Sequence, residues 1–560
     1  MGATNTAGRL LASVFKSGPQ DPTFCSCLDV PNGGVLLGLP GLLSMGLLRH
    51  TDKYFQLPNG YYRLDSIFLL LAFMALARIK TIEDLRYCPP GERGKLLGLD
   101  LIPEAKTLRE KVHLLVANNQ ASHWGGELSL DWMGMFPESS GVLYIDGHVR
   151  VYNGSKTELP RHYVARQKLC LRATTDYWVG AMDGQPFFMV NKSVDPGLLT
   201  VLIEDIVPRL EHDIPCQPSL LELEEEKYLS RFTMVFDREG YSPDFMLRMR
   251  ERRIACLTYR KYSGEDWPEM EFHEQMVSLA AGHRVTMKLA ERGTFLGGKI
   301  WVREIRKLTG SGHQTSIIST DYTRELTASA AAMFARWSQE NFFKYMRENY
   351  NLDRLVDYSI EEIPESTEVV NPKYREADGK VRKLVAQLAR KRCKCNELLL
   401  RDDIEPKKVE KYETKKQTLL EEVESMAKNL VELKKHRKAT PKHVKLSDLP
   451  QEDHFKMLGM KSKYFIDVIK LVSYRAETAM VNIARQTMRH QDEARSLLRS
   501  LYATDADILP DYEGGKLTVR LHQPANNCSA NIINDICREL NATNTEFPGT
   551  KLRLVYELVS

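Results

Sequence analysis

The hydrophobic periodicity changes at about residue 141, and this change constrains the fold more than any other feature of the chain. From 34 to 118 apolar residues recur at three and four positions, which predicts buried helices. From 141 to 350 short apolar runs alternate with helical segments. This order predicts three antiparallel strands, a helix, a β-α-β unit and a final helix, which together form a mixed α/β sheet with flanking helices.

Two of the apolar runs end in an aspartate. The first begins at residue 142 and ends at Asp146, and the second begins at residue 232 and ends at Asp237. A third acid, Glu340, lies on the final helix, predicted over 325–349. Converging carboxylates raise one another's pKa unless cations neutralise them, and Mg²⁺ binds oxygen ligands. The three acids therefore indicate a metal site at the end of the sheet.

Basic residues accompany these acids. Arg336, Lys344 and Arg347 lie on nearby turns of the final helix, and Arg238 directly follows the second aspartate. An aspartate after a strand is also a common turn former or helix cap, and each acid taken alone favours that interpretation. The combination of three acids with cations that can bind phosphate favours a nucleic-acid substrate.

Three further residues admit two interpretations each. Gly147-His148 is predicted as a tight turn to a second strand, in which His148 either orients the acid before it or only fills the turn. Asp321 is predicted as the N-cap of the final helix, with a fourth metal carboxylate as the alternative. Trp301 is predicted to lie in a core, with stacking on a DNA base as the alternative.

Three strings of the sequence resemble the acidic motifs of bacterial insertion-sequence DDE transposases, enzymes with an RNase H-like catalytic core. They are Tyr144–Tyr152, Val235–Gly240 and Arg336–Lys344. One large branch of the family carries a Tyr, Arg, Glu and Lys signature on its last helix. This chain matches it at Arg336 and Glu340, with Arg347 in the lysine place and Met333 in the tyrosine place.

The resemblance implies an RNase H-like fold and a metal-binding triad of Asp146, Asp237 and Glu340. It also implies two Mg²⁺ ions, for which Mn²⁺ can substitute, and cleavage of DNA at the ends of an element. The freed 3′-hydroxyl would then attack target DNA. The expected partners are terminal inverted repeats, target DNA and a second copy of the chain on paired ends. The alternatives are a stand-alone RNase H-like endonuclease and a decayed, non-catalytic DNA-binding protein.

The rest of the chain is predicted as four further regions. Residues 1–33 resemble a flexible arm, and 34–140 form a helical domain that binds DNA through Arg109, or else an ordinary helical hairpin. A β-rich insertion covers about 262–313 within a catalytic domain over 141–360. Residues 371–440 carry 20 Lys and Arg against 12 Asp and Glu, and a heptad seam predicts a basic helical hairpin. Residues 441–560 are predicted as helical and α+β.

Composition excludes other classes. The formal net charge is +4, so any DNA-binding charge must be local. The longest uncharged apolar run, Ile67–Ala77, is too short for a helix that needs about 20 residues to span a membrane. The ten cysteines show no disulfide or zinc spacing. We therefore expect a soluble, cytoplasmic protein, and the resemblance to bacterial transposases implies a bacterial protein that associates with the nucleoid.

Overall fold

The computed structural model forms two compact units, which are described separately. Unit 1 comprises 1–152, 162–359 and 458–560, and unit 2 comprises 153–161 and 360–457. The residues that the structure describes are 6–15, 18–154, 159–164, 167–279, 284–334, 337–354, 356, 360–399, 409–451, 454, 456–523 and 527–559. Side chains of 335–340 lie outside this description.

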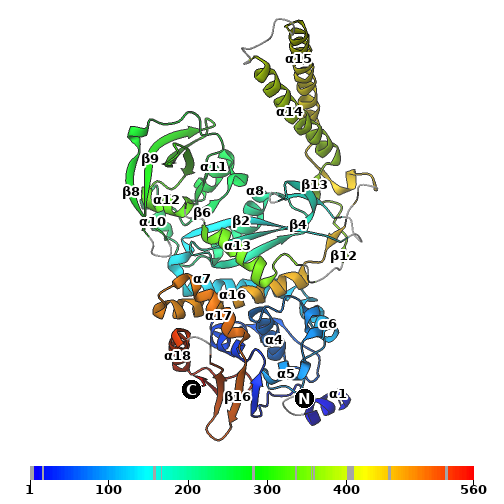
Figure 1. Cartoon of the computed structure of the whole chain (residues 1–560), viewed down its shortest axis with the longest axis vertical. Helices are drawn as coiled ribbons and strands as arrows, with labels where there is room; N and C mark the ends of the chain where they lie inside the picture. Colours follow the sequence, from blue (N-terminus) through cyan, green and yellow to red (C-terminus); the bar gives the residue numbers. More distant parts are fainter. Residues whose placement is uncertain are drawn as a thin grey trace. The chain divides into compact units, whose positions relative to one another are not determined.

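A mixed sheet of ten strands forms the middle of unit 1 (Figure 1). Its order is β3-β4-β2-β6-β7-β11-β10-β9-β8, and β5 pairs with β4. The pairs β2–β4 and β4–β5 are antiparallel, whereas β2–β6 and β6–β7 are parallel. The strands are β2 (Val142–Val151), β3 (Arg161–Val164), β4 (Leu169–Gly180), β5 (Pro186–Lys192), β6 (Thr233–Phe236), β7 (Ala255–Tyr259), β8 (His273–Ser278), β9 (Arg284–Leu296), β10 (Ile300–Leu308) and β11 (Gln314–Ser319).

The helices of this region follow the predicted order. The connection from β5 to β6 is helical, with a π-helical segment between two α-helices, and α11 connects β6 to β7. The predicted final helix is described as two helices on either side of residues 335 and 336, which lie outside the described residues. The elements are α8 (Leu198–Val201), η4 (Leu202–Ile206), α9 (Val207–Asp213), α10 (Leu220–Glu225), η5 (Arg238–Gly240), α11 (Pro243–Glu251), η6 (Glu269–Glu271), α12 (Leu326–Phe334) and α13 (Trp337–Tyr350).

The two faces of the central strands pack against different parts of unit 1. Every residue of β6 is buried, as expected for a strand covered on both faces. Leu143 and Phe236 belong to the large hydrophobic core of the unit. Tyr144 and Val235 point to the other face and form a separate cluster with Met333 of α12. The alternation of strand side chains thus gives β2 and β6 one face toward the main core and one toward α12.

The predicted turn at Gly147-His148 is wrong. β2 continues through both residues, because its pairing with β4 runs without a break from Tyr144 opposite Gly180 to Val151 opposite Ala173. Asp146 therefore lies within a strand and not at its end. The parallel pairing with β6 stops one residue earlier, at Ile145.

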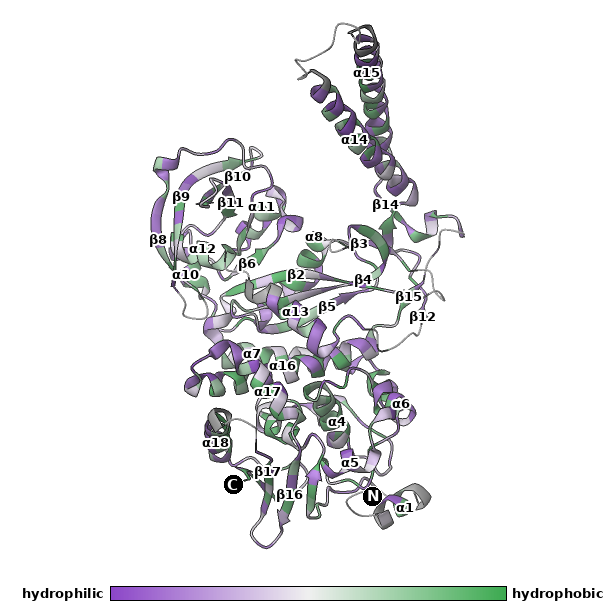
Figure 2. Ribbon diagram, viewed as in Figure 1, coloured by the Kyte–Doolittle hydropathy of each residue, from purple (hydrophilic) through white to green (hydrophobic). Residues whose placement is uncertain are grey.

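The N-terminal and C-terminal parts of unit 1 share one hydrophobic core, which includes Phe68 of α4 and Phe465 of α16. α4 is green along most of its length in Figure 2, in keeping with a helix buried on several sides. Residues 27–30 form strand β1 of a four-stranded sheet with order β1-β16-β17-β18, where the sequence analysis expects a flexible arm. The division into two units thus differs from the predicted boundaries at 140 and 441.

The remaining elements of unit 1 lie before residue 141 and after residue 460. The N-terminal ones are α1 (Thr6–Phe15), β1 (Cys27–Val30), η1 (Gly33–Gly38), α2 (Leu39–Ser44), α3 (Thr51–Tyr54), α4 (Leu64–Leu76), η2 (Ile82–Tyr87), α5 (Pro90–Lys95), α6 (Ala105–Val116), α7 (Gln120–Met135) and η3 (Pro137–Ser140). The C-terminal ones are α16 (Lys461–Thr487), η10 (Gln491–Glu493), α17 (Ala494–Ala503), β16 (Ala506–Asp511), β17 (Lys516–Leu521), α18 (Asn527–Ala542) and β18 (Arg553–Leu558).

Unit 2 consists mainly of a helical hairpin, α14 (Pro372–Leu399) and α15 (Val409–Ala439). The hairpin prediction is confirmed. Val381 and Leu388 of α14 pack against Leu430 of α15, and other seam residues of α15 join them. The heptad seam is therefore filled by the neighbouring helix of the same chain. The short strands of this part are β12 (Ile360–Glu361), β13 (Glu368–Val370), β14 (His443–Lys445) and β15 (Met457–Leu458), with η8 (Leu446–Asp448) after β14.

Among the described residues, no helix is both long enough and apolar enough to cross a membrane.

Candidate functional site

Asp146 and Asp237 follow the last paired residues of two neighbouring parallel strands. Ile145 of β2 lies opposite Phe236 of β6, so the next residue of each strand is an aspartate. Neighbouring strands lie about 4.8 Å apart, which places the two acids side by side at the end of the parallel pairing. The register thus brings together two of the three acids that the sequence indicates.

Local hydrogen bonds position both carboxylates. Oδ1 of Asp146 accepts a hydrogen bond from the backbone N–H of Gly147 at 3.0 Å. Oδ1 of Asp237 accepts one from the N–H of Arg238 at 2.6 Å and caps the short helix η5. Both aspartates are half-buried. Each side chain is therefore held by the backbone that follows it, at the surface of the sheet.

The two helices that follow β11 contact the sheet on both sides of Asp146. Tyr144 and His148 lie two residues before and after it and share its face. The Tyr144 hydroxyl donates to the carbonyl of Ala332 in α12. The His148 ring stacks on Phe343 of α13, with centroids 5.0 Å apart and planes 6° apart. Both α12 and α13 therefore contact the face that carries Asp146.

Glu340, the third predicted ligand, lies on α13, three residues before Phe343. The Glu340 side chain and the whole of Arg336 lie outside the described residues. In the part of the chain that the structure describes, no third His, Cys, Asp or Glu forms a tight group with Asp146 and Asp237.

Asp353, which was not among the predicted site residues, pairs with His148. Its Oδ1 lies 2.5 Å from Nε2 of the buried His148 ring. His148 is therefore fixed between a carboxylate and the aromatic face of Phe343. The two paired residues are 205 positions apart, and no local motif marks Asp353, so a single sequence carries no signal for this pair.

Buried charges continue along the same face of β2. Arg150, two residues beyond His148, forms ion pairs with Asp176 of β4 and, at 3.4 Å, with Asp467 of α16. Asp467 also pairs with Lys463. Burial raises the pKa of Asp176, against the opposing effect of Arg150. Burial lowers the pKa of Lys463 to about 7, and Asp467 opposes this shift. The paired charges join the sheet to α16 beside the candidate site.

The predicted DNA-binding cations occupy different places. Arg238 is exposed, and its guanidinium lies 5.6 Å from the centre of the Tyr259 ring. Lys344 is exposed on α13. Arg347 is half-buried, and its Nε donates to the carbonyl of Phe343 at 3.3 Å. These three residues lie on the elements that carry the acids.

Arg109 lies elsewhere, on α6, where it pairs with Glu83. Together with Leu71 of α4 and Ile469 of α16 it lines a pocket.

Asp321 is neither the N-cap of a helix nor a neighbour of the two acids. Its Oδ1 accepts hydrogen bonds from the backbone N–H groups of Thr323 at 3.1 Å and Arg324 at 3.0 Å. The helix α12 begins only at Leu326. Oδ2 of Asp321 accepts a hydrogen bond from the hydroxyl of Thr233, the first residue of β6. Asp237 follows the other end of that strand, about 13 Å away at 3.3 Å per residue. Asp321 thus stabilises a turn at the opposite edge of the sheet.

The prediction that Trp301 is a core residue is also wrong, because 52% of it is exposed. Its ring centroid lies 6.4 Å from that of Phe295 on the neighbouring strand β9. A Cβ at Gly293 would come within 2.2 Å of the indole, so the glycine makes room for the ring on the sheet surface. Stacking of Trp301 on a base stays a prediction.

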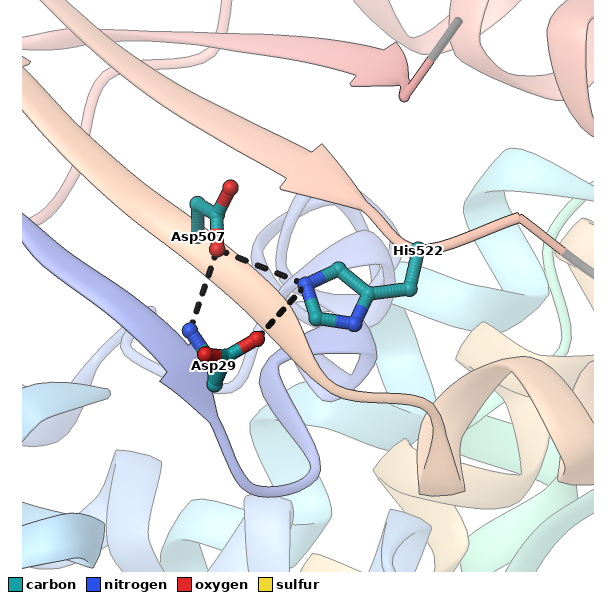
Figure 3. A group of neighbouring side chains, drawn as sticks. All are labelled: Asp29, Asp507 and His522. Carbon is teal, nitrogen blue, oxygen red and sulfur yellow. Dashed lines mark hydrogen bonds and ion pairs between the residues drawn. The ribbon is translucent and has the colours of Figure 1, made fainter.

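A second group of possible metal ligands joins the ends of the chain (Figure 3). Among the described residues, Asp29, Asp507 and His522 bring their ligand atoms within 4.8 Å of one another. Nε2 of His522 lies 3.5 Å from Asp29 and 3.3 Å from Asp507. Asp507 also accepts from the backbone N–H of Asp29 at 3.0 Å. These contacts tie β1 to β16 and to the end of β17, and they account for the group without an ion.

A family model described as "Transposase protein" matches residues 1–560. The chain therefore belongs to this family of transposases, proteins that move segments of DNA. No curated protein matches it. Among solved structures it is similar to the piggyBac transposase in a synaptic complex with hairpin DNA, at 11% identity and a TM-score of 0.27. The match covers 55% of this chain and 64% of that chain.

Proposed function

We propose that the chain is a metal-dependent DNA transposase of the DDE class, with Asp146, Asp237 and Glu340 as its catalytic acids. The observation that carries this proposal is the position of two aspartates at the end of the parallel pairing of neighbouring strands, on the face that α12 and α13 contact. The strand order β5-β4-β2-β6-β7, with three antiparallel strands followed by two parallel ones, supports an RNase H-like core. Membership of the transposase family supports the activity.

The residues present fit Mg²⁺, or Mn²⁺ in its place. Asp146 and Asp237 offer carboxylate oxygens, the donors that these hard cations prefer. Each has its Oδ1 oriented by a backbone N–H, which leaves the geometry of the carboxylate fixed before any ion binds. Glu340 would supply a further oxygen from α13. Two bound ions would activate the attacking oxygen and stabilise the leaving oxygen of a phosphodiester.

The remaining side chains of the site orient the acids and the DNA. His148, held by Asp353 and Phe343, fixes α13 against β2. Arg238 and Lys344 are exposed and can bind phosphates on either side of the scissile bond. No covalent protein–DNA intermediate is required, so catalysis rests on positioning and on stabilisation of charge. The proposed substrates are the terminal repeats of an element and target DNA, held by a homodimer in the cytoplasm.

The alternative of a nuclease on the same fold shares every residue of this site. The two activities differ in the joining step, because only a transposase transfers the cut 3′-end into a second DNA. The test incubates the full chain with Mg²⁺, a labelled DNA that carries the repeats flanking its gene, and a supercoiled target plasmid. We expect cleavage followed by covalent joining of label to plasmid. Cleavage without joining would favour the nuclease.

The matched variants are Asp146→Asn, Asp237→Asn and Glu340→Gln, with Asp266→Asn on an exposed loop as control. Each of the first three should lower cleavage by about 10³-fold or more, comparable to the loss of a central electrostatic group in other enzymes. The control should cleave like the parent chain. Unchanged cleavage in Asp146→Asn or Asp237→Asn would show that the assignment of the acids is wrong.

A further inference from the structure

A pocket of about 540 Å³ lies in unit 1 between α4, α6, the segment after α13 and α16. Its volume falls within the range of small-molecule sites, roughly 300–1,000 Å³. One part of its wall is apolar. Its apolar residues include Leu71, Met74, Ile79, Ile82, Ile466 and Ile469. The pocket is thus built for the body of a small organic ligand.

The charged residues of the pocket are mostly basic. Lys80, Arg109, Arg354 and Lys470 line it, against one acid, Glu83. Glu83 pairs with Arg109 and, at 2.7 Å, with a second arginine outside the pocket lining. The lining therefore carries an excess of positive charge that can bind an anion carried by the organic ligand.

Lys470 is the informative member of this set. Only 8% of it is exposed, and it forms no ion pair among the described residues. Its Nζ donates to the carbonyl of Asn351 at 3.4 Å, a long hydrogen bond. Asp467, one turn earlier, already pairs with Lys463 and Arg150. Burial lowers the pKa of Lys470. A buried ammonium group without a carboxylate is costly, and a phosphate in the pocket would compensate for it.

We propose that this pocket binds a nucleoside phosphate, with its phosphate held by Lys470, Arg109 and Arg354 and its base against the apolar wall. A phosphate monoester carries a charge of about −1.5 to −2 at pH 7, which suits the excess of cations. A flat, weakly polar base suits a wall of aliphatic side chains. The same chemistry has two sources, a free nucleotide or an unpaired nucleotide of a bound DNA strand. This site goes beyond the proposed function and uses none of its acids.

The test is isothermal titration of the full chain with deoxyadenosine 5′-monophosphate, deoxyadenosine and inorganic phosphate. We expect one saturable site for the nucleotide and at least about 10-fold weaker binding of the nucleoside and of phosphate alone. Lys470→Met should weaken nucleotide binding by about 10-fold or more. Lys461→Met, which removes an exposed lysine of the same helix outside the pocket, is the matched control and should bind like the parent.

Two further variants separate binding from folding. Lys80→Gln changes an exposed residue of the lining and should weaken nucleotide binding by about 3-fold. Lys470→Arg keeps the positive charge and should retain most of the nucleotide affinity. Absence of nucleotide binding by the parent chain would overturn the proposal. The proposal would also be overturned if a folded Lys470→Met variant bound the nucleotide as tightly as the parent does. The same holds if the parent bound the nucleoside as tightly as the nucleotide.

Displacement of a fluorescent nucleotide distinguishes the two sources. A duplex with one unpaired terminal nucleotide should displace it if the ligand comes from DNA, whereas no displacement assigns the pocket to a free nucleotide. Displacement by a blunt duplex as effective as by the unpaired one would contradict a nucleotide pocket, because it would indicate general charge attraction. Asp146→Asn should bind the nucleotide normally, so failure of the catalytic proposal and failure of this one are distinguishable.

Discussion

His148 and Asp353 show how single residues position the candidate site. Asp146 lies on β2 two residues before His148, whose ring is held by Phe343 of α13 on one side and by Asp353 on the other. Neither His148 nor Asp353 needs to touch DNA to matter, because together they set where α13 lies on the sheet. α13 also carries Glu340. A small displacement of a catalytic group is costly in enzymes, so we expect this pair to be needed for the placement of α13 at the proposed site.

We predict that His148→Gln and Asp353→Asn each lower kcat for DNA cleavage by about 10-fold, with little change in KM. The kcat of the double variant should be no lower than that of either single variant, because both substitutions remove the same interaction. Cleavage kinetics of the four proteins check this. His212→Gln is the control, since His212 is exposed and pairs with Asp213 of its own helix α9. Additive losses would contradict a shared positioning role.

A second residue-scale prediction concerns Lys463, whose pKa falls to about 7 in the folded chain from an ordinary value of 10.5. Between these two pH values the unfolded chain binds more protons at this residue than the folded chain does. Its contribution to the free energy of unfolding therefore rises with pH from 7 toward 10.5. Urea unfolding of the parent and of Lys463→Met at pH 7, 8 and 9 measures this contribution of Lys463 to the free energy of unfolding. The difference, parent minus variant, should increase with pH, and a constant or falling difference would contradict the buried, weakly protonated lysine.

At the scale of the element, short apolar runs were the most predictable part of the fold. The strands β7 and β17 coincide with apolar runs of the sequence at 255–259 and 516–521, because a buried strand is a continuous or alternating apolar run between polar turns. The prediction failed where the pattern was locally ambiguous. Gly147 suggests a turn in sequence, yet it sits within β2 because the long partner strand β4 continues the pairing. Within the region 441–560, predicted only as helical and α+β, α16 and α17 are separate helices.

The candidate site was predictable only in part, and for a related reason. Asp146 and Asp237 could be found because each follows an apolar run, and the parallel register then places them together. Asp353 and the buried partners of Arg150 are brought into place by contacts between segments that are distant in sequence. Such contacts leave no periodic pattern in the sequence. The exposure of Trp301 could not be predicted either, because an aromatic residue in an alternating strand fits either face until the tertiary packing is known.

The helical hairpin of unit 2 allows an element-scale prediction. Val370 and His443 are paired across β13 and β14, so the chain enters and leaves the hairpin at one place. Replacing residues 371–442 with Asn-Gly should close the two strands with a tight turn and leave the thermal unfolding of unit 1 unchanged. It removes the net charge of +8 that 371–440 carries. If the hairpin binds DNA, the slope of log affinity against log salt should fall by about 0.9 for each lost phosphate contact.

Fluorescence anisotropy with a labelled duplex at several salt concentrations measures that slope. Changing exposed Lys428 and Lys434 of α15 to Gln gives an intermediate case in the intact hairpin and should lower the slope partially. A slope equal to that of the parent chain in both proteins would show that the hairpin has no part in DNA binding.

At the scale of the whole molecule, unit 1 combines segments from both ends of the chain with the central sheet. The N-terminal helices and α16 enclose one core, and α16 also supplies the charges that pair with Arg150 of β2. The sheet that carries the acids is therefore anchored by residues more than 300 positions away. This arrangement agrees with a family model that spans 1–560 and not only the acidic motifs.

Asp146 and Asp237 are proposed to bind the same metal ion, and Mn²⁺ binding to the full chain tests this proposal most directly. Electron paramagnetic resonance counts the bound ion in the parent, in Asp146→Ala, in Asp237→Ala and in two controls. Asp321→Ala removes the carboxylate at the opposite edge of the sheet, and Asp29→Ala breaks the second ligand group. We predict that the two site variants lose Mn²⁺ and both controls retain it. Mn²⁺ binding that survives in Asp146→Ala and Asp237→Ala but disappears in Asp29→Ala would contradict the account.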